Sequence, residues 1–361
     1  MDEGNRFSRG HPGIHVFPAA LAIAQQRRAS GAALLVALVA GYEVAARIGA
    51  ASEIRPALHP HGTWGTVGAA VAVRKLLGGS AADMARTINV ASTLGLATSS
   101  TTMREGRTVR NAFAGVSGKL ALLANDLVDA GFSGESDGLR SVYDGVVSTG
   151  FRWDRMLDSL GERWEIQRNY FKLHACCRFN HAALDALAAA LGNRSEPVAT
   201  ADIAAIEVHT YGLAARLTEA HPTNPLAAKY SLPFALATAL VHGSTGVEAF
   251  SAQAVAHPEV LRLAQQVRVQ EDQAMTRQLP ARRPARVTVR LVSGEQYTGR
   301  VETNRGDAEE PLSEDELARK FMRLVTGSWP PAAASLLRTR LLDLDGLRDA
   351  STLFDFGRTT P

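Results

Sequence analysis

Two turns that join histidine to proline carry the clearest chemical signal in the chain. They are His11-Pro12-Gly13 and His59-Pro60-His61-Gly62-Thr63, and a segment rich in small residues follows each. A helix start offers unpaired backbone N–H groups and the positive end of the helix dipole, and a nearby imidazole adds a donor or a proton carrier. Each turn therefore suits a carboxylate or phosphate, and two such turns suit a ligand with several acidic groups. Taken singly, each is better explained as an ordinary turn before a helix.

A second polar segment spans residues 171–181. Four of its side chains can pair with a polycarboxylate: Lys172, His174, Arg178 and His181. His181 is explained equally well by helix capping or core packing as by ligand contact. The adjacent Cys176 and Cys177 can be nucleophiles, but we favour small buried hydrophobic residues. Their spacing matches no zinc site, and we expect no metal.

Arg110 lies near the start of a long predicted helix, where it can bind a carboxylate or simply be solvated. The small or apolar residues 112–115 that follow favour a functional role. Asp2 and Glu3 can act as acid or base, although chain ends are often frayed. Imidazoles and cations beside a carboxylate indicate carbanion chemistry: a base removes an acidified C–H proton, and the cations stabilise the enolate-type charge. The chain has no P-loop, nucleophile elbow, dinucleotide fingerprint or zinc helix.

The composition excludes several classes of protein. The 361 residues suffice for about two domains, and 46% hydrophobic with 21% charged residues is typical of a globular chain. The net charge of +3 is scattered and not interleaved with aromatic residues, which disfavours nucleic-acid binding. Two cysteines indicate a reducing compartment. The longest apolar stretch, 32–40, is shorter than the roughly 18 residues of a membrane span. Charges precede any apolar run, so we expect no signal peptide and a cytoplasmic protein.

Helical periodicity dominates the two ends of the chain. It predicts helices at 18–28, 31–48, 66–77, 81–96, 109–130, 313–325, 332–342 and 347–353. Ser313-Glu314-Asp315-Glu316 reads as a capping box, and residues 98–108 as a loop.

The middle of the chain changes character. Residues 203–210, 285–292 and 296–303 alternate as strands, the last two joined as a hairpin, and helices are predicted at 183–191, 227–242 and 258–266. We therefore predict a mainly α fold with an α+β insertion. An all-helical domain is formed from both chain ends, 1–168 and 305–361, and a smaller α+β lid domain covers 169–304. A cleft between the domains is the natural place for a ligand.

Motifs spread over nearly the whole chain resemble those of the MmgE/PrpD family, which includes 2-methylcitrate dehydratase, cis-aconitate decarboxylase and an iminodisuccinate epimerase. Lys172, Cys177 and His181 fit the family's Lys-x-x-x-x-Cys-x-x-x-His spacing. The other matching segments, in order, are residues 2–3, 11–13, 18–22, 41–44 with Arg47, 59–60 with Gly65, 68–70, 130–134, 228–234 and 311–313. Each motif is weak, and their order and spacing together are specific.

The resemblance implies a helical domain with an α+β lid, a homodimer, and no metal or organic cofactor. It places the site groups on Asp2, His11, His59, Arg110 and Lys172, with His181 and Lys229 as further contacts. His61, in the second His-Pro turn, is a further candidate for substrate binding. Family members usually have several more helices before the acidic motif. Many also have lysine where Arg110 stands, and arginine cannot act as a proton-transfer base. The base is then a histidine, Lys172 or Asp2.

Three hypotheses follow for the function. The first is a cofactor-independent lyase, a hydratase or dehydratase of a small di- or tricarboxylate such as a methylcitrate-like acid, with decarboxylation as a related possibility. The second is an isomerase or epimerase that removes the same proton and returns it to the opposite face, which Arg110 favours. The third is an inactive truncated homologue.

Overall fold

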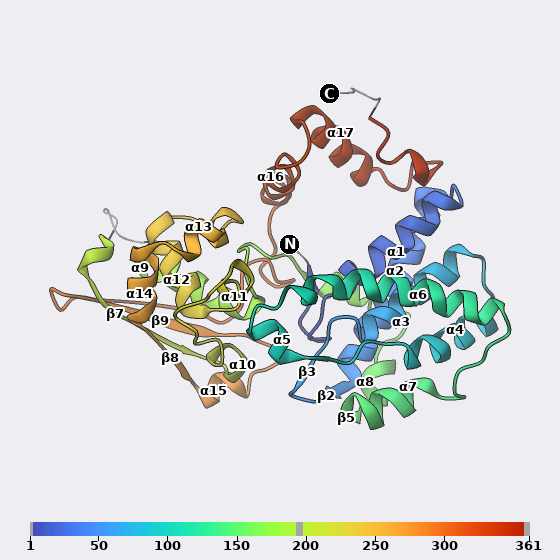
Figure 1. The fold of residues 1–361 in the computed structure, drawn as a ribbon, viewed down its shortest axis with the longest axis horizontal. Coiled ribbons are helices and arrows are strands. Elements are labelled where there is room, and N and C mark those ends of the chain that lie inside the picture. The colour runs from blue at the N-terminus through green and yellow to red at the C-terminus, as the bar shows by residue number, and fades with distance from the viewer. Residues whose placement is uncertain (1–2, 193–197, 357–361) are drawn as a thin grey trace. The chain divides into compact units, whose positions relative to one another are not determined.

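The computed structural model describes residues 3–192 and 198–356, and two compact units account for them. Unit 1 comprises Ser99–Arg110 and Tyr170–Pro311. Of the described residues, unit 2 comprises 3–98, 111–169 and 312–356. Most of the regular structure is helical, and the sheet of more than two strands lies in unit 1 (Figure 1). The predicted fold class, mainly α with a smaller α+β part, is therefore confirmed.

Unit 2 is built chiefly from helices. Its longer helices are α1 (Pro12–Gln26), α2 (Gly31–Ala51), α3 (Trp64–Leu76), α4 (Ala81–Thr93), α6 (Phe113–Asp129), α16 (Glu314–Val325) and α17 (Pro331–Leu342). Its shorter elements are α7 (Gly138–Arg140), α8 (Trp153–Leu157), β1 (Gly4–Asn5), β2 (Ser52–Ile54), β3 (Leu58–His59) and β5 (Ser148–Phe151). Strands β4 (Thr98–Ser99) and β6 (Asn169–Tyr170) fall at the limits of the units. The helix predicted at 347–353 is only a 3-10 turn, Ala350–Thr352.

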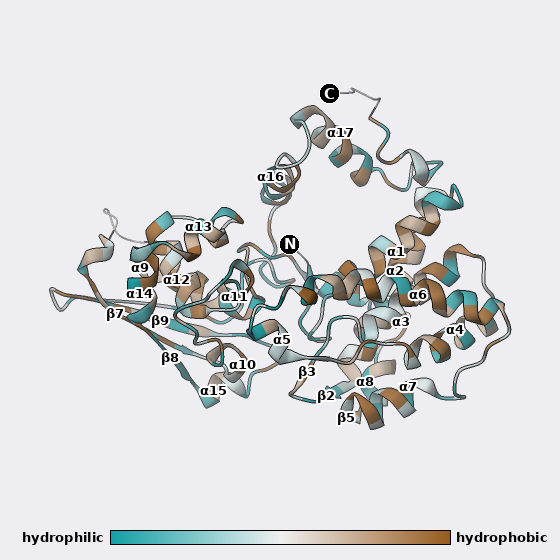
Figure 2. Ribbon diagram, viewed as in Figure 1, coloured by the Kyte–Doolittle hydropathy of each residue, from teal (hydrophilic) through white to brown (hydrophobic). Residues whose placement is uncertain are grey.

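Local signals in the sequence fix several helix starts in unit 2. The Ser313 hydroxyl accepts a hydrogen bond from the Glu316 N–H, and the Glu316 carboxylate accepts one from the Ser313 N–H, so the predicted capping box is confirmed. Ser80 and Asp83 form the same box at α4. In Figure 2 hydrophobic and hydrophilic segments alternate along α6, as expected of a helix with one buried face.

Close helix packing in unit 2 depends on small residues. A Cβ at Gly41 of α2 would lie 2.4 Å from the Gly68 carbonyl oxygen of α3. A Cβ at Gly68 would lie equally close, at 2.4 Å, to the Gly41 carbonyl oxygen. The two backbones therefore touch where these glycines face each other, and any side chain would push α2 and α3 apart. This contact holds α3 against α2, and the turn that carries His59 and His61 comes just before α3.

Helix α2 is long and apolar enough to cross a membrane, with a mean hydropathy of 1.6 over its most apolar window. More than half of that window, 56%, is buried inside the protein. The helix also carries a buried ion pair between Glu43 and Arg47, with Nε and Oε1 2.5 Å apart. Burial and an internal ion pair are typical of a core helix, which passes the same length test.

Unit 1 contains a four-stranded sheet in the order β10-β9-β7-β8. The strands are β7 (Ile203–Thr210), β8 (Val267–Glu271), β9 (Ala285–Leu291) and β10 (Gln296–Val301). The hairpin β9–β10 and strand β7 were predicted, and β8 was not. Strand β8 pairs parallel to β7, with Val208 opposite Val269. Parallel strands are joined by a long crossover connection, so the residues of β8 alone do not indicate its pairing with β7.

The helices of unit 1 cover this sheet and its ends. They are α5 (Ser100–Arg104), α9 (His181–Leu191), α10 (Gly212–Ala215), α11 (Pro225–Ala228), α12 (Leu232–His242), α13 (Ala252–Val255), α14 (Pro258–Gln265) and α15 (Gln273–Thr276). Figure 1 shows α9, α12 and α14 along one side of the sheet. Gly299 of β10 permits close contact with α9, because a Cβ there would lie 2.1 Å from the Ala186 carbonyl oxygen. The loop predicted at 98–108 contains α5, and Gly106 packs against α11.

Candidate active site

Three histidines of unit 2 gather around the imidazole of a fourth, His61. The ring of His61 lies 4.8 Å from His11, 4.7 Å from His59 and 5.3 Å from His15, measured between centroids. The His59 ring also faces Phe113 at 6.3 Å. The two His-Pro turns thus meet, and they bring together the predicted residues His11, His59 and His61. His15 was not predicted, although its position four residues after His11 places it one helical turn further along α1.

Two glycines allow this histidine cluster to form. A Cβ at Gly65, in the first turn of α3, would lie 2.5 Å from Cγ of His15, so only glycine leaves room for that ring. Gly62 has a φ of +83°, a left-handed conformation that favours glycine. Its N–H donates to Nε2 of His15 at 3.3 Å. His15 therefore supports the second turn rather than standing apart from it.

The start of α1 already holds a carboxylate from the chain itself. Oε1 of Glu3 accepts from the Gly13 N–H at 2.6 Å, and Oε2 accepts from the Tyr42 hydroxyl at 3.0 Å. A carboxylate at the positive end of the helix dipole is stabilised there. The anion expected at the first His-Pro turn is thus supplied at least partly by Glu3. Asp2, which was predicted as an acid or base, lies outside the described residues.

The backbone fixes opposite tautomers for His11 and His59. Nδ1 of His11 is 2.5 Å from the Glu3 carbonyl oxygen, which can only accept, so Nδ1 carries a proton. The basic nitrogen of neutral His11 is then Nε2. Nδ1 of His59 accepts from the His61 N–H at 3.2 Å, so neutral His59 carries its proton on Nε2. One imidazole can take a proton through Nε2 while the other donates through Nε2.

Unit 1 holds a second group of predicted residues, gathered around Cys177. Burial raises the pKa of the Cys177 thiol, and the positive charges of Lys172, Arg110 and Arg283 oppose that rise. Lys172 and Arg283 are themselves buried, at 6% and 5% exposure. Arg110 also lies over the Tyr230 ring, with its guanidinium carbon 5.9 Å from the centroid. Because all three cations act on the same thiol, we group them as a cationic cluster (Lys172, Arg110, Arg283), which suits an anion with several charges. Arg283 was not predicted.

A buried ion pair supports the segment that carries Lys172. Nη2 of Arg178 is 2.8 Å from Oδ1 of Asp307, and both side chains are nearly inaccessible. The Arg178 guanidinium also lies 4.4 Å from the Tyr170 ring centroid and donates to Nδ1 of His181 at 3.0 Å. Burial, and then the charge of Arg178, lower the pKa of His181 well below its usual value. His181 is therefore neutral, and its contact with Arg178 is that of a supporting residue; its predicted role toward substrate stays a prediction.

The remaining predicted residues lie beside the same segment. The backbone carbonyl of Lys229 accepts from the Cys177 N–H at 2.8 Å and from Nδ2 of Asn180 at 3.3 Å. Cys176 is buried, and burial raises the pKa of its thiol to about 12. The preference for buried cysteines over reactive ones is thus supported for Cys176, because the thiolate is the reactive form.

Two protein-family models match the chain. Residues 6–154 match the model of the MmgE/PrpD N-terminal domain, and residues 174–344 match that of the MmgE/PrpD C-terminal domain. Together the two models cover most of the chain.

Individual relatives match over a similar range. A cis-aconitate decarboxylase of Aspergillus terreus is 24% identical over 363 aligned residues, which cover 94% of this chain and 74% of the relative. The same enzyme from strain NIH 2624 / FGSC A1156 is 23% identical. A cis-aconitate decarboxylase-like protein, oryM, of Aspergillus oryzae is 25% identical over 350 residues, covering 90% of this chain and 70% of the relative.

Proposed function

The chain belongs to the MmgE/PrpD family, and from that premise we propose that it is a cofactor-independent lyase, a hydratase or dehydratase acting on a small di- or tricarboxylate such as a methylcitrate-like acid. Its relatives named as decarboxylases of cis-aconitate support an enzyme that processes organic acids. They do not select the reaction, because dehydration and decarboxylation of such acids both build up charge beside a carboxylate. The choice between them is part of the proposal.

The observation that carries the proposal is the pair of opposite tautomers at His11 and His59. Nε2 of His11 removes the proton from the carbon beside a carboxylate. The Nε2–H of His59 donates a hydrogen bond to the oxygen that gains charge as the proton leaves. The Lys172 ammonium gives a proton to the departing hydroxide, which leaves as water. Solvent then returns the proton from His11 to Lys172, which restores both groups. Asp2 is a further candidate acid or base.

Substrate binding falls to the remaining cations and imidazoles. Arg110 and the buried Lys172 neutralise substrate carboxylates, with His61, His181 and Lys229 as further contacts. A bidentate guanidinium suits a carboxylate and keeps its proton at all working pH values. Arg110 is therefore assigned to binding and not to proton transfer.

The first experiment is a panel assay of the purified chain with methylcitrate, citrate and cis-aconitate. We expect loss or addition of water with at least one of them. The ultraviolet absorbance of the unsaturated acid measures this reaction. Incubation in deuterium oxide separates the alternative isomerase, which would incorporate deuterium without loss of water or carbon dioxide. A folded protein that neither turns over nor exchanges any of these acids would overturn the enzyme proposal and favour an inactive homologue.

Variants of the histidine cluster test the assigned roles. His11→Gln and His59→Gln should each lower kcat by about 10²–10⁴-fold, the usual contribution of a positioned acid or base. His242→Gln is the matched control, because His242 is exposed on α12. Arg110→Gln should raise KM more than it lowers kcat. Loss of activity in the control as well, or full activity in both cluster variants, would refute the assignment.

We also propose that the protein is a cytoplasmic homodimer with no metal cofactor and no nucleic-acid or membrane partner. Support comes from the family resemblance and from the burial of much of α2. Sedimentation at several concentrations measures the oligomeric state, and a monomer at all of them would refute the dimer. Undiminished activity after dialysis against a strong chelator is expected.

A further inference from the structure

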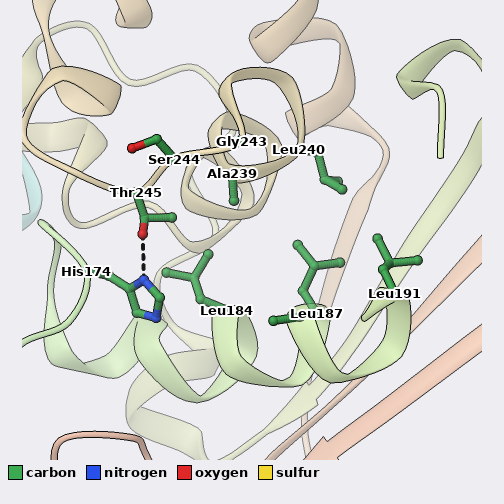
Figure 3. A pocket seen from close by; sticks show the side chains of 10 residues that line it. His174, Leu184, Leu187, Leu191, Ala239, Leu240, Gly243, Ser244 and Thr245 are labelled. Carbon is green, nitrogen blue, oxygen red and sulfur yellow. Dashed lines mark hydrogen bonds between the residues drawn. The ribbon is translucent and has the colours of Figure 1, made fainter. Parts of the chain in front are cut away.

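A cavity in unit 1 is lined mainly by apolar side chains, and no residue of the cationic cluster is among those that line it. It has a volume of about 220 Å³. Figure 3 shows Leu184, Leu187 and Leu191 of α9 along one side and Leu240 of α12 on another. Ala188 and Ala239 complete this apolar wall. An apolar cavity of about 150 Å³ can hold a benzene-sized molecule, so this one can hold a chain of about six carbons.

One end of the cavity is polar, and its side chains form a series of hydrogen bonds. Oγ1 of Thr245 is 2.6 Å from Nδ1 of His174, and Nε2 of His174 is 3.1 Å from Oδ1 of Asp185 (Figure 3 shows the first contact). The Asp185 carboxylate also accepts from the Arg305 N–H at 3.0 Å. An ionised carboxylate can only accept, so His174 donates through Nε2, and in the neutral imidazole Nδ1 is then the acceptor.

This chain of contacts fixes what the Thr245 hydroxyl can offer. With His174 neutral, the Thr245 proton is directed to Nδ1 of His174, so the Thr245 oxygen faces a ligand as an acceptor. Hydrogen bonds in series polarise one another, which makes this oxygen a better acceptor than an isolated hydroxyl. A ligand that meets Thr245 must therefore donate.

Two carboxylates lie near this end, and the Arg178 guanidinium lies beyond His181, whose ring is 4.8 Å from that of His174. Asp185 lies behind His174, and Glu248 accepts from the Ser244 hydroxyl at 2.8 Å beside Thr245. Two carboxylates favour a cation and disfavour an anion. This is the reverse of the cationic cluster around Cys177, so a polycarboxylate is not the expected ligand here.

We propose that this cavity binds a small aliphatic molecule of about six carbons with a hydrogen-bond-donating head, a primary ammonium or an alcohol. The tail packs against the leucines of α9 and α12, and the head donates to Oγ1 of Thr245. The site is separate from the proposed catalytic chemistry, so its test does not depend on turnover.

The experiment is a titration of the isotope-labelled chain followed by the methyl signals of its leucines. Hexylamine and 1-hexanol should shift the leucine signals of α9 and saturate, and hexanoate should bind at least tenfold more weakly. Ala188→Phe, which fills the cavity from an exposed position, should abolish the shifts. Ala189→Phe, exposed next to it but not lining the cavity, is the matched control.

Variants of Thr245 test the role of the head group. Thr245→Val removes the acceptor at nearly constant volume and should weaken hexylamine binding at least tenfold, while Thr245→Ser should retain it. Equal binding of amine, alcohol and carboxylate would overturn the assignment of the head. Absence of binding, or binding that survives Ala188→Phe, would overturn the site.

Discussion

Replacing Arg47 with alanine should destabilise unit 2 strongly, because this buried side chain joins α2 to a loop far along the chain. Nε of Arg47 is 2.5 Å from Oε1 of Glu43. The two terminal nitrogens donate to the backbone carbonyls of Met156 at 3.1 Å, Asp158 at 2.8 Å and Arg163 at 2.9 Å. Arg47 itself is 1% exposed. One guanidinium thus neutralises a buried carboxylate and fixes the loop that follows α8.

The size of the effect follows from what Arg47→Ala leaves behind. Glu43 would keep a buried charge without its cation, and removing one partner of a buried ion pair costs about 3–5 kcal/mol. The three carbonyls would lose charged donors as well, so we expect a loss of at least about 3 kcal/mol. For a unit of this size each kcal/mol shifts Tm by about 2–4 °C, which predicts a fall of roughly 6–12 °C. Arg47→Lys should also destabilise unit 2, because a single ammonium group cannot reach the carboxylate and the backbone carbonyls at the same time.

Urea unfolding followed by circular dichroism measures the effect. The double variant Glu43→Gln, Arg47→Met removes both charges. Its loss of stability should be smaller, by about 0.5–3 kcal/mol, than the summed losses of the single variants Glu43→Gln and Arg47→Met. A loss below about 1 kcal/mol for Arg47→Ala, or strict additivity in the double variant, would refute the reasoning.

Three further predictions concern the two groups of site residues. Gly65→Ala should lower the free energy of unfolding by about 1–3 kcal/mol and displace the His15 ring. Gly115→Ala is the control, because a Cβ there meets nothing within 4 Å, and it should be neutral or slightly stabilising. Urea unfolding of both variants measures the difference. His181 has a lowered pKa, so below about pH 6.5 the unfolded chain binds the extra proton and stability falls as pH decreases; His181→Gln should reduce that slope by up to about 1.4 kcal/mol per pH unit. An unchanged slope would contradict a neutral buried imidazole. Burial raises the pKa of Cys176 to about 12, which predicts alkylation at pH 8 about a thousandfold slower in the native than in the unfolded protein, measured by mass spectrometry.

Much of the helical part could be predicted because its signals are local. The period of apolar residues located α2 and α3 to within three residues at either end, and the Ser313 capping box fixed the start of α16. The alternating pattern of 285–303 predicted the hairpin. Strand β8 was missed because its partner β7 lies about 60 residues away, and no local pattern records that pairing.

The imidazoles and cations of the candidate site could also be predicted from the sequence. The two His-Pro turns and the segment around Lys172 stood out by composition and spacing alone. Their surroundings did not, because contacts between distant residues have no signature in a single sequence. Glu3 at the start of α1 and Arg283 beside Cys177 are contacts of this kind.

The sequence by itself therefore determined which side chains carry imidazoles and cations, and that each His-Pro turn leads into a helix. The tertiary structure decided that the two turns meet around His61, and which nitrogen of each imidazole carries its proton. The physical reason is that a tautomer depends on the hydrogen-bond partner of the other ring nitrogen. For His11 that partner is the carbonyl of Glu3, and for His59 it is the N–H of His61. Only folding brings the Glu3 carbonyl to His11 and the His61 N–H to Nδ1 of His59. These two contacts set the direction in which a proton can move.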